Sequence, residues 1–262
     1  YRRMDIGTAK PTAEEMDGVP HHMIAVADPG ENWSVARYVR SAVPIVDDIL
    51  SRGKLPILVG GTGLWLDALV RGRDFAGGHA GGTVRKELQA RLAAEGIEAL
   101  LAELRQVDPE SAARLHPSDE KRILRALEVY RETGETISAH NARTASQPPR
   151  YDAVWIGLRF ADRQDMKDLI DRRVDKMVEA GLLQEVRGLL ESGLSRESTA
   201  LQAIGYKELQ AYLDGQEELQ QAVERIQQET RRYAKRQLTW FRRDERYRFF
   251  LAEDFADRES MH

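Results

Sequence analysis

The protein has 262 residues, a length that suits one large domain or two unequal ones. Its composition of 42% hydrophobic and 31% charged residues is typical of a globular protein and excludes a disordered or fibrous chain. It contains no cysteine, which excludes disulfides, thiolate metal sites and cysteine nucleophiles. The sequence has no membrane-spanning apolar run and no secretory leader, so we expect a cytoplasmic location, and the net charge of −4 taken alone argues against a polyanion-binding protein.

The first part of the sequence predicts an α/β arrangement. The chain begins at Tyr1 in a polar stretch without an initiator methionine, so we expect further residues upstream. Ser34 is a suitable cap for a helix that ends near Gly53. The apolar run 55–59 predicts a buried strand of a parallel sheet, which leads into the glycine loop 60–63 and a second helix.

The middle of the sequence predicts a small all-helical insertion. Residues 74–83 contain several glycines, which predict a flexible joint. Almost all of 83–133 has helical periodicity, and a polar loop is expected over 138–150. We therefore expect an α/β core over residues 1–76 and 151–262, interrupted by a helical domain over 77–150.

The last part of the sequence returns to the α/β pattern. Alternating apolar residues over 153–158 predict a strand, and Asp162 is a suitable cap for the helices that follow. A long final helix is expected over 217–243, and 247–251 is a candidate edge strand.

The glycine loop is a candidate anion site. A strand that ends in Gly60-Gly61-Thr62-Gly63 before a helix offers backbone N–H groups, a hydroxyl and the positive end of the helix. The loop lacks the Gly-Lys-Ser/Thr ending of a Walker A motif. A tight structural turn explains the same residues equally well.

Adjacent arginines provide a second candidate for binding phosphates. Arg172 and Arg173 lie in the middle of an expected helix, where neighbouring side chains diverge by about 100°, so we expect one of them to point inward. A guanidinium binds diphosphate oxygens through two parallel hydrogen bonds. The alternative is that both lie at the surface, paired with Asp171 and Asp175.

Two further groups of cations are candidates for a nucleic-acid interface. Lys121, Arg122 and Arg125 share one helical stretch, although neighbouring acidic residues could balance them. Residues 231–248 contain eight basic residues and two acidic ones, interleaved with aromatic rings. Cations for phosphates beside rings for bases are typical of an RNA-binding surface, and a solvated helix face with core aromatics is the alternative. The six histidines show no metal-ligand spacing.

Several sequence blocks, in order, carry a resemblance to a known family. They are Met4-Asp5-Ile6-Gly7-Thr8-Ala9-Lys10-Pro11, Val19-Pro20-His21-His22, Pro56-Ile57-Leu58-Val59-Gly60-Gly61-Thr62-Gly63-Leu64-Trp65, Arg122-Ile123-Leu124-Arg125-Ala126-Leu127-Glu128-Val129-Tyr130, Ala203-Ile204-Gly205-Tyr206-Lys207-Glu208 and Tyr233-Ala234-Lys235-Arg236-Gln237-Leu238-Thr239-Trp240-Phe241-Arg242. Over essentially its whole length, the chain resembles the tRNA dimethylallyltransferases.

The resemblance implies a P-loop NTPase-like parallel-sheet core with a small all-helical insertion domain. It implies transfer of a dimethylallyl group from dimethylallyl diphosphate, assisted by Mg²⁺, to the exocyclic amine of the adenine 3′-adjacent to the anticodon of tRNA. The enzyme is expected to be a monomer that binds the tRNA anticodon stem-loop. In the family a phosphate-binding loop and a general-base Asp lie upstream of the position matching Tyr1, so we expect this N-terminal segment to be missing from the present sequence.

The resemblance also assigns site residues. Thr62 and Arg173 are expected to be catalytic, and Arg173 and Lys10 to bind the diphosphate. The residues expected to bind tRNA are Arg85, Lys121, Arg122, Arg125, Gly205, Tyr206, Lys207, Lys235, Arg236, Gln237, Thr239, Trp240 and Arg242. The alternatives are an isopentenyltransferase for free adenine nucleotides and a non-catalytic RNA-binding protein.

Overall fold

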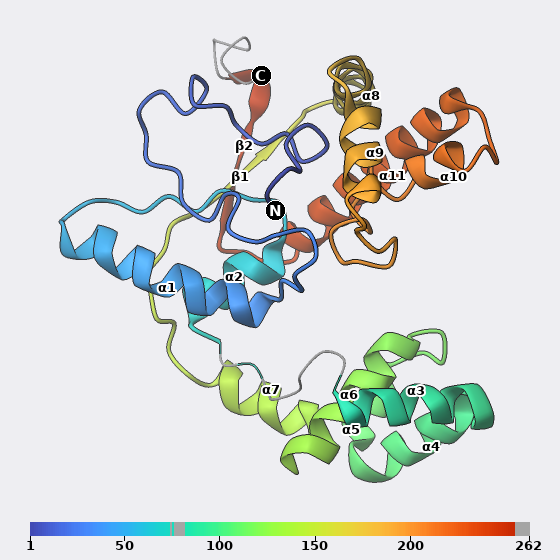
Figure 1. Cartoon of the computed structure of the whole chain (residues 1–262). Coiled ribbons are helices and arrows are strands. Elements are labelled where there is room, and N and C mark those ends of the chain that lie inside the picture. Colours follow the sequence, from blue (N-terminus) through green and yellow to red (C-terminus); the bar gives the residue numbers. More distant parts are fainter. Residues whose placement is uncertain (74, 76–81, 255–262) are drawn as a thin grey trace. The chain divides into compact units, whose positions relative to one another are not determined.

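The computed structural model describes residues 1–73, 75 and 82–254, and the chain divides into two compact units (Figure 1). We call Tyr1–Leu69 with Asp152–His262 the core unit, and Val70–Tyr151 the helical unit. The boundaries expected from the sequence were 76/77 and 150/151, and most of the expected flexible joint lies outside the described residues. None of the helices in these described ranges is long and apolar enough to cross a membrane.

The core unit contains a small parallel sheet. Strand β1 (Trp155–Arg159) pairs with β2 (Tyr247–Leu251) in a register that places Trp155 opposite Tyr247. The facing rings of this pair meet edge to face with centroids 5.2 Å apart, which stabilises the register. Both strands confirm the sequence prediction, and the helices between them provide the crossover that parallel pairing requires.

Helices make up most of the regular structure of the core unit. They are α1 (Val35–Ser51), α2 (Gly63–Arg71), α8 (Arg163–Glu179), α9 (Leu182–Glu191), α10 (Leu209–Leu213) and α11 (Leu219–Phe241), with a short 3₁₀ helix η1 (Ala252–Asp254) at the end. The Ser34 side chain caps α1 as predicted, because it accepts a hydrogen bond from the Arg37 backbone N–H. Apolar residues of α8, α9, α10 and α11 form one buried cluster, into which Met4 inserts.

The strand predicted over 55–59 is wrong. These residues form no strand in the structure, and Leu55, Ile57 and Val59 are 82%, 77% and 90% exposed. A buried parallel strand needs hydrogen-bonded neighbours, and the described sheet contains β1 and β2 alone. The composition of residues 55–59 favours a strand, but within the described residues no neighbouring strand pairs with them.

The described part of the helical unit packs five helices around its own core. They are α3 (Thr83–Glu95), α4 (Ile97–Val107), α5 (Pro109–Arg114), α6 (Glu120–Thr133) and α7 (Ile137–Ala145). Leucines of α3, α4 and α6 are almost completely buried and form the centre of this cluster. The turns predicted at Gly96 and Asp108-Pro109 separate these helices as expected.

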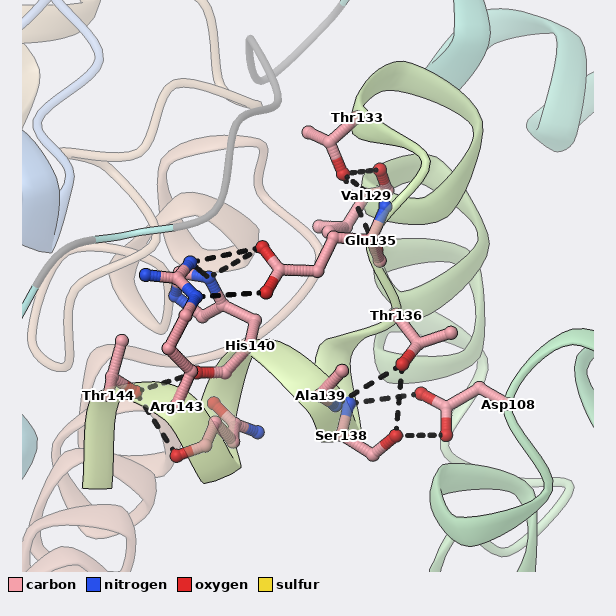
Figure 2. Close-up of polar contacts among 11 residues, drawn as sticks. Asp108, Val129, Thr133, Glu135, Thr136, Ser138, Ala139, His140, Arg143 and Thr144 are labelled. Atoms are coloured by element: carbon pink, nitrogen blue, oxygen red, sulfur yellow. Dashed lines mark hydrogen bonds and ion pairs between the residues drawn. The ribbon is translucent and has the colours of Figure 1, made fainter. Parts of the chain in front are cut away.

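Helix α7 replaces most of the loop that was predicted over 138–150. The Thr136 side chain caps it by accepting a hydrogen bond from the Ala139 N–H, and Asp108 accepts hydrogen bonds from the Ser138 N–H at 3.1 Å and hydroxyl at 2.6 Å (Figure 2). Burial by itself would raise the pKa of Asp108, but the hydrogen bonds from Ser138 and Ser111 hold it below its ordinary value. Ser138, the first polar residue of the predicted loop, instead lies in the first turn of this helix and donates to Asp108.

Candidate active site and nucleic-acid interface

The glycine loop packs against one face of α11. The Gln237 side-chain amide donates a hydrogen bond to the Gly61 carbonyl at 3.0 Å, and the hydroxyls of Thr62 and Tyr233 lie 3.1 Å apart. Trp240 lies next to Gly63. Residues 233, 237 and 240 recur at helical spacing, so a single face of α11 holds three consecutive residues of the loop.

The two glycines that flank Thr62 allow this close approach. A Cβ atom at Gly61 would overlap the Gln237 amide, and one at Gly63 would overlap the Trp240 indole. Thr62 itself is exposed, and its backbone carbonyl accepts a hydrogen bond from the Trp65 N–H in the first turn of α2. The loop therefore presents one hydroxyl at a helix N-terminus on a backbone that α11 holds in place.

These contacts engage two of the residues predicted to bind tRNA, Gln237 and Trp240, and their binding to tRNA stays a prediction. The Gln237 side chain is engaged with the loop, and the indole of Trp240 packs beside Gly63 while the residue remains 51% exposed. The Thr239 hydroxyl donates to the Lys235 carbonyl of its own helix. The sequence placed these residues on one helix, but it did not indicate that the glycine loop lies against them.

The C-terminal part of α11 and its cap residue Arg242 are also basic and exposed. Lys235, Arg236 and Arg242 all have exposed side chains, and no carboxylate within the described residues forms an ion pair with any of them. The neighbouring basic residues differ, since Arg231 pairs with Asp171, and Arg232 with Glu229 at 2.5 Å. Three unpaired cations on one helix form a surface suited to a polyanion. We call Lys235, Arg236 and Arg242 the basic triad.

The predicted contact segment 205–207 is largely buried. Tyr206 is fully buried, and its hydroxyl donates to the Glu185 carboxylate at 2.5 Å. Burial, together with this carboxylate, raises the pKa of Tyr206 above its ordinary value. Gly205 is also buried, whereas Lys207 has an exposed side chain, 3.4 Å from Glu208. Among these three residues Lys207 is the one exposed to a partner, and contact of the segment with tRNA stays a prediction.

Glu185 ties the N-terminal segment to this buried site. Its carboxylate accepts hydrogen bonds from the backbone N–H groups of Asp5 at 2.7 Å, Ile6 at 2.9 Å and Gly7 at 3.2 Å. The Tyr206 ring packs so closely on Gly7 that a Cβ atom there would overlap it. One side chain of α9 therefore fixes the conformation of the N-terminal loop. We call this arrangement the Glu185 clamp.

Lys10 is already engaged within the same loop. Its ammonium donates to the Tyr1 carbonyl at 2.9 Å and forms an ion pair with Asp5. Lys10 thus helps to hold the N-terminal loop together, and its contact with the diphosphate stays a prediction. No sequence pattern distinguishes these two uses of a lysine.

The paired arginines of α8 do not divide as expected. Arg172 and Arg173 are both exposed, because the next residue, Val174, occupies the buried position on the helix. Within the described residues neither guanidinium forms an ion pair, although Asp171 and Asp175 are nearby in sequence. Asp171 pairs with Arg231 instead. Arg173 is thus accessible to a ligand, and so is Arg172.

In the helical unit, a buried carboxylate links two of the predicted tRNA-binding residues. Glu128 of α6 has a side chain only 3% exposed, and it pairs with Arg125 at 2.9 Å and with Arg85 of α3 at 3.9 Å. Lys121 and Arg122 are exposed, and Arg122 lies 3.8 Å from Asp119. Arg85, Arg125 and Glu128 therefore form one cluster, whereas Lys121 and Arg122 stand apart from it.

Comparison with known proteins assigns the chain to a family. The model of the family described as IPP transferase matches residues 1–244. The chain belongs to the IPP transferase family. It is 44% identical over 262 residues to the tRNA dimethylallyltransferase of Caldanaerobacter subterraneus subsp. tengcongensis, covering 100% of this chain and 83% of that protein.

Solved structures of IPP transferases agree with the fold. A crystal structure of the full-length tRNA isopentenylpyrophosphate transferase from Bacillus halodurans is 43% identical, with a TM-score of 0.69 over 100% of this chain and 81% of that one. A eukaryotic dimethylallyltransferase acting on tRNA is 29% identical, with a TM-score of 0.74 over 90% of this chain and 59% of that one. These matches support an α/β fold with a small parallel sheet and many helices.

Three polar residues with notable contacts, two in the core unit and one in the helical unit, were not singled out from the sequence. Glu185 contacts residues about 180 positions away, and Glu128 looks like an ordinary balancing charge until its burial is seen. Tyr233 had a usable signal, because it shares helical spacing with Gln237 and Trp240. Nothing in the spacing, however, indicated its contact with Thr62.

Proposed function

We propose that this member of the IPP transferase family is a tRNA dimethylallyltransferase. It transfers a dimethylallyl group from dimethylallyl diphosphate to the exocyclic amine of the adenine 3′-adjacent to the anticodon. The observation that carries the proposal is the organisation of α11. One face of this helix holds Thr62, and the helix and its cap residue Arg242 carry the basic triad, which forms no ion pair within the described residues. A hydroxyl for the diphosphate and a cationic surface for the tRNA are what the reaction requires.

The chemistry has one bond formed and one broken. The adenine amine nitrogen forms a bond to the allylic carbon while the bond from that carbon to the diphosphate oxygen breaks. The proton lost by the nitrogen passes to the departing diphosphate or to water. Negative charge grows on the departing diphosphate, so hydrogen-bond donors and cations directed at its oxygens lower the barrier. Thr62 supplies the hydroxyl, and Arg173 supplies the guanidinium.

Magnesium remains a prediction. Within the described ranges, no three histidine or acidic side chains gather into a group that could hold a metal ion. Mg²⁺ is often held mainly by substrate phosphates and water, with few protein ligands. A Mg²⁺ ion bound with the diphosphate would neutralise part of its charge, beside the donors that Thr62 and Arg173 supply.

Replacing Thr62 with alanine tests the proposed active site. We expect the single-turnover rate of dimethylallyl transfer to tRNA to fall about tenfold or more, the scale of one lost catalytic hydrogen bond. Thr230→Ala is a matched control, because the Thr230 hydroxyl donates to the Ile226 carbonyl of its own helix. A Thr62→Ala enzyme with the parental rate would remove this hydroxyl from the reaction.

The neighbouring arginines of α8 provide a matched pair for the diphosphate. We expect Arg173→Ala to raise the KM for dimethylallyl diphosphate about tenfold or more, because a hydrogen bond to a charged group is worth about 1.5–3 kcal/mol. Arg172→Ala removes the same charge one residue away on the same exposed helix. If Arg172→Ala produces the larger change, the diphosphate residue is Arg172.

The proposal also includes a P-loop-like core, a monomeric enzyme and a cytoplasmic location. The parallel pairing of β1 and β2 through helical crossovers supports the first of these. Light scattering of the purified protein, alone and with tRNA, tests the second. Fractionation of cells expressing the protein tests the third.

A further inference from the structure

We infer that Tyr233 is a positioning residue that donates a hydrogen bond to Thr62 and thereby directs the Thr62 proton toward the diphosphate. This inference rests on the proposed function, because it assigns a second residue to the same site. It concerns the face of α11 that carries Tyr233, Gln237 and Trp240, for which the sequence predicted only a place in the protein core or a contact with tRNA. The relevant groups are the Tyr233 phenol, the Thr62 hydroxyl and the loop contacts on either side.

The backbone on both sides of Thr62 is held by the same helix that carries Tyr233. Gln237 binds the Gly61 carbonyl at 3.0 Å, and Trp240 packs beside Gly63. Within the described part of the chain, the Tyr233 oxygen, at 3.1 Å, is the side-chain partner of the Thr62 hydroxyl. Because the loop is fixed at Gly61 and Gly63, this hydrogen bond sets the direction of the hydroxyl.

The direction of the hydrogen bond follows from the chemistry of the two groups. A threonine hydroxyl has one proton and two acceptor lone pairs, whereas a phenol is the stronger donor and the weaker acceptor of the two. The Arg236 guanidinium lies 5.7 Å from the centroid of the Tyr233 ring, and a nearby cation makes the phenol oxygen a still weaker acceptor. Tyr233 therefore donates, and the Thr62 proton is available to another acceptor.

An exposed hydroxyl with a free proton is suited to an anionic substrate. Thr62 is exposed at the start of α2, where backbone N–H groups also favour negative charge. A hydroxyl that accepts one hydrogen bond becomes a better donor in the next, because chains of hydrogen bonds polarise one another. The Thr62 proton thus stabilises a diphosphate oxygen most strongly as the allylic carbon–oxygen bond breaks.

Tyr233→Phe tests this inference with little change in shape. The substitution keeps the ring and its contact with Arg236 and removes only the phenol oxygen. We expect kcat to fall about three- to tenfold, the scale of one hydrogen bond. The KM for dimethylallyl diphosphate, the affinity for tRNA and the melting temperature should stay at the parental values. Tyr212→Phe is the control, because Tyr212 packs in the core of the unit away from this loop.

A double-mutant cycle separates positioning from simple support of the loop. If Tyr233 acts through Thr62, Thr62→Ala with Tyr233→Phe should be no slower than Thr62→Ala alone. In the Thr62→Ser background, which retains a hydroxyl, Tyr233→Phe should again lower kcat.

Three results would overturn the inference and leave the proposed function standing. The first is a parental kcat in Tyr233→Phe. The second is a double variant, Thr62→Ala with Tyr233→Phe, whose loss of kcat equals the sum of the two single losses in free energy. The third is a Tyr233→Phe variant that loses kcat together with a lowered melting temperature. Parental kcat in Thr62→Ala would instead remove Thr62 from the proposed site, and the role of Tyr233 with it.

Discussion

Glu185→Ala is expected to destabilise the core unit by about 2–4 kcal/mol. The side chain accepts three backbone hydrogen bonds from the N-terminal loop and one from the buried Tyr206, and its removal leaves these donors without a partner. In a chain of this length the loss corresponds to a decrease in melting temperature of roughly 5–10 °C. The loop is also expected to lose its fixed conformation, because the carboxylate accepts hydrogen bonds from three of its backbone N–H groups.

Hydrogen exchange locates this effect. The amide protons of Asp5, Ile6 and Gly7 should exchange faster in Glu185→Ala than in the parent protein. Glu191→Ala is the matched control, because Glu191 is exposed on the same helix and accepts none of these bonds. Parental protection of the three amides would show that the Glu185 clamp does not hold the loop in solution.

Replacing the basic triad with glutamine is expected to weaken tRNA binding by about tenfold or more. Each cation that contacts a phosphate contributes about 0.7–0.9 to the slope of log K against log salt, so the triple variant should have a slope shallower by about two to three. Dimethylallyl diphosphate should bind as in the parent protein. Transfer to tRNA should fall in proportion to the lost affinity.

A control variant with the same change in net charge tests whether position matters. Arg40, Lys54 and Arg187 are exposed cations elsewhere in the core unit, and their replacement by glutamine also removes three charges. This control should keep most of the affinity for tRNA. A basic-triad variant within about twofold of the parent would identify the triad as a solvated helix face, and would favour free adenine nucleotides as acceptors.

The elements that the sequence predicted correctly have local signals. Ser34 and the apolar spacing that follows it mark α1, and the long periodic segment after residue 217 marks α11. In these cases the residues that determine the structure lie within a few positions of one another, where capping and helical periodicity apply. The alternation of β2 is equally local.

The elements that the sequence did not predict depend on distant partners. The run 55–59 has the composition of a strand, but composition does not reveal whether a neighbouring strand is present. The side chains of Lys10 and Gln237 have donors suited to a ligand, and both bind backbone carbonyls of this chain instead. For the candidate site, the sequence indicated Thr62 and the basic helix, and their contact through Tyr233 became visible only in three dimensions.

The packing of the glycine loop on α11 restricts which residues evolution can place in the loop and on the facing side of the helix. A larger residue at position 61 displaces the mobile end of Gln237 and breaks its hydrogen bond, whereas one at position 63 meets the rigid indole of Trp240. Position 63 can therefore accept a side chain only after position 240 has become smaller, while position 61 has more freedom. Substitutions at 63 and 240 should be inherited together, although the two positions are 177 positions apart in the sequence.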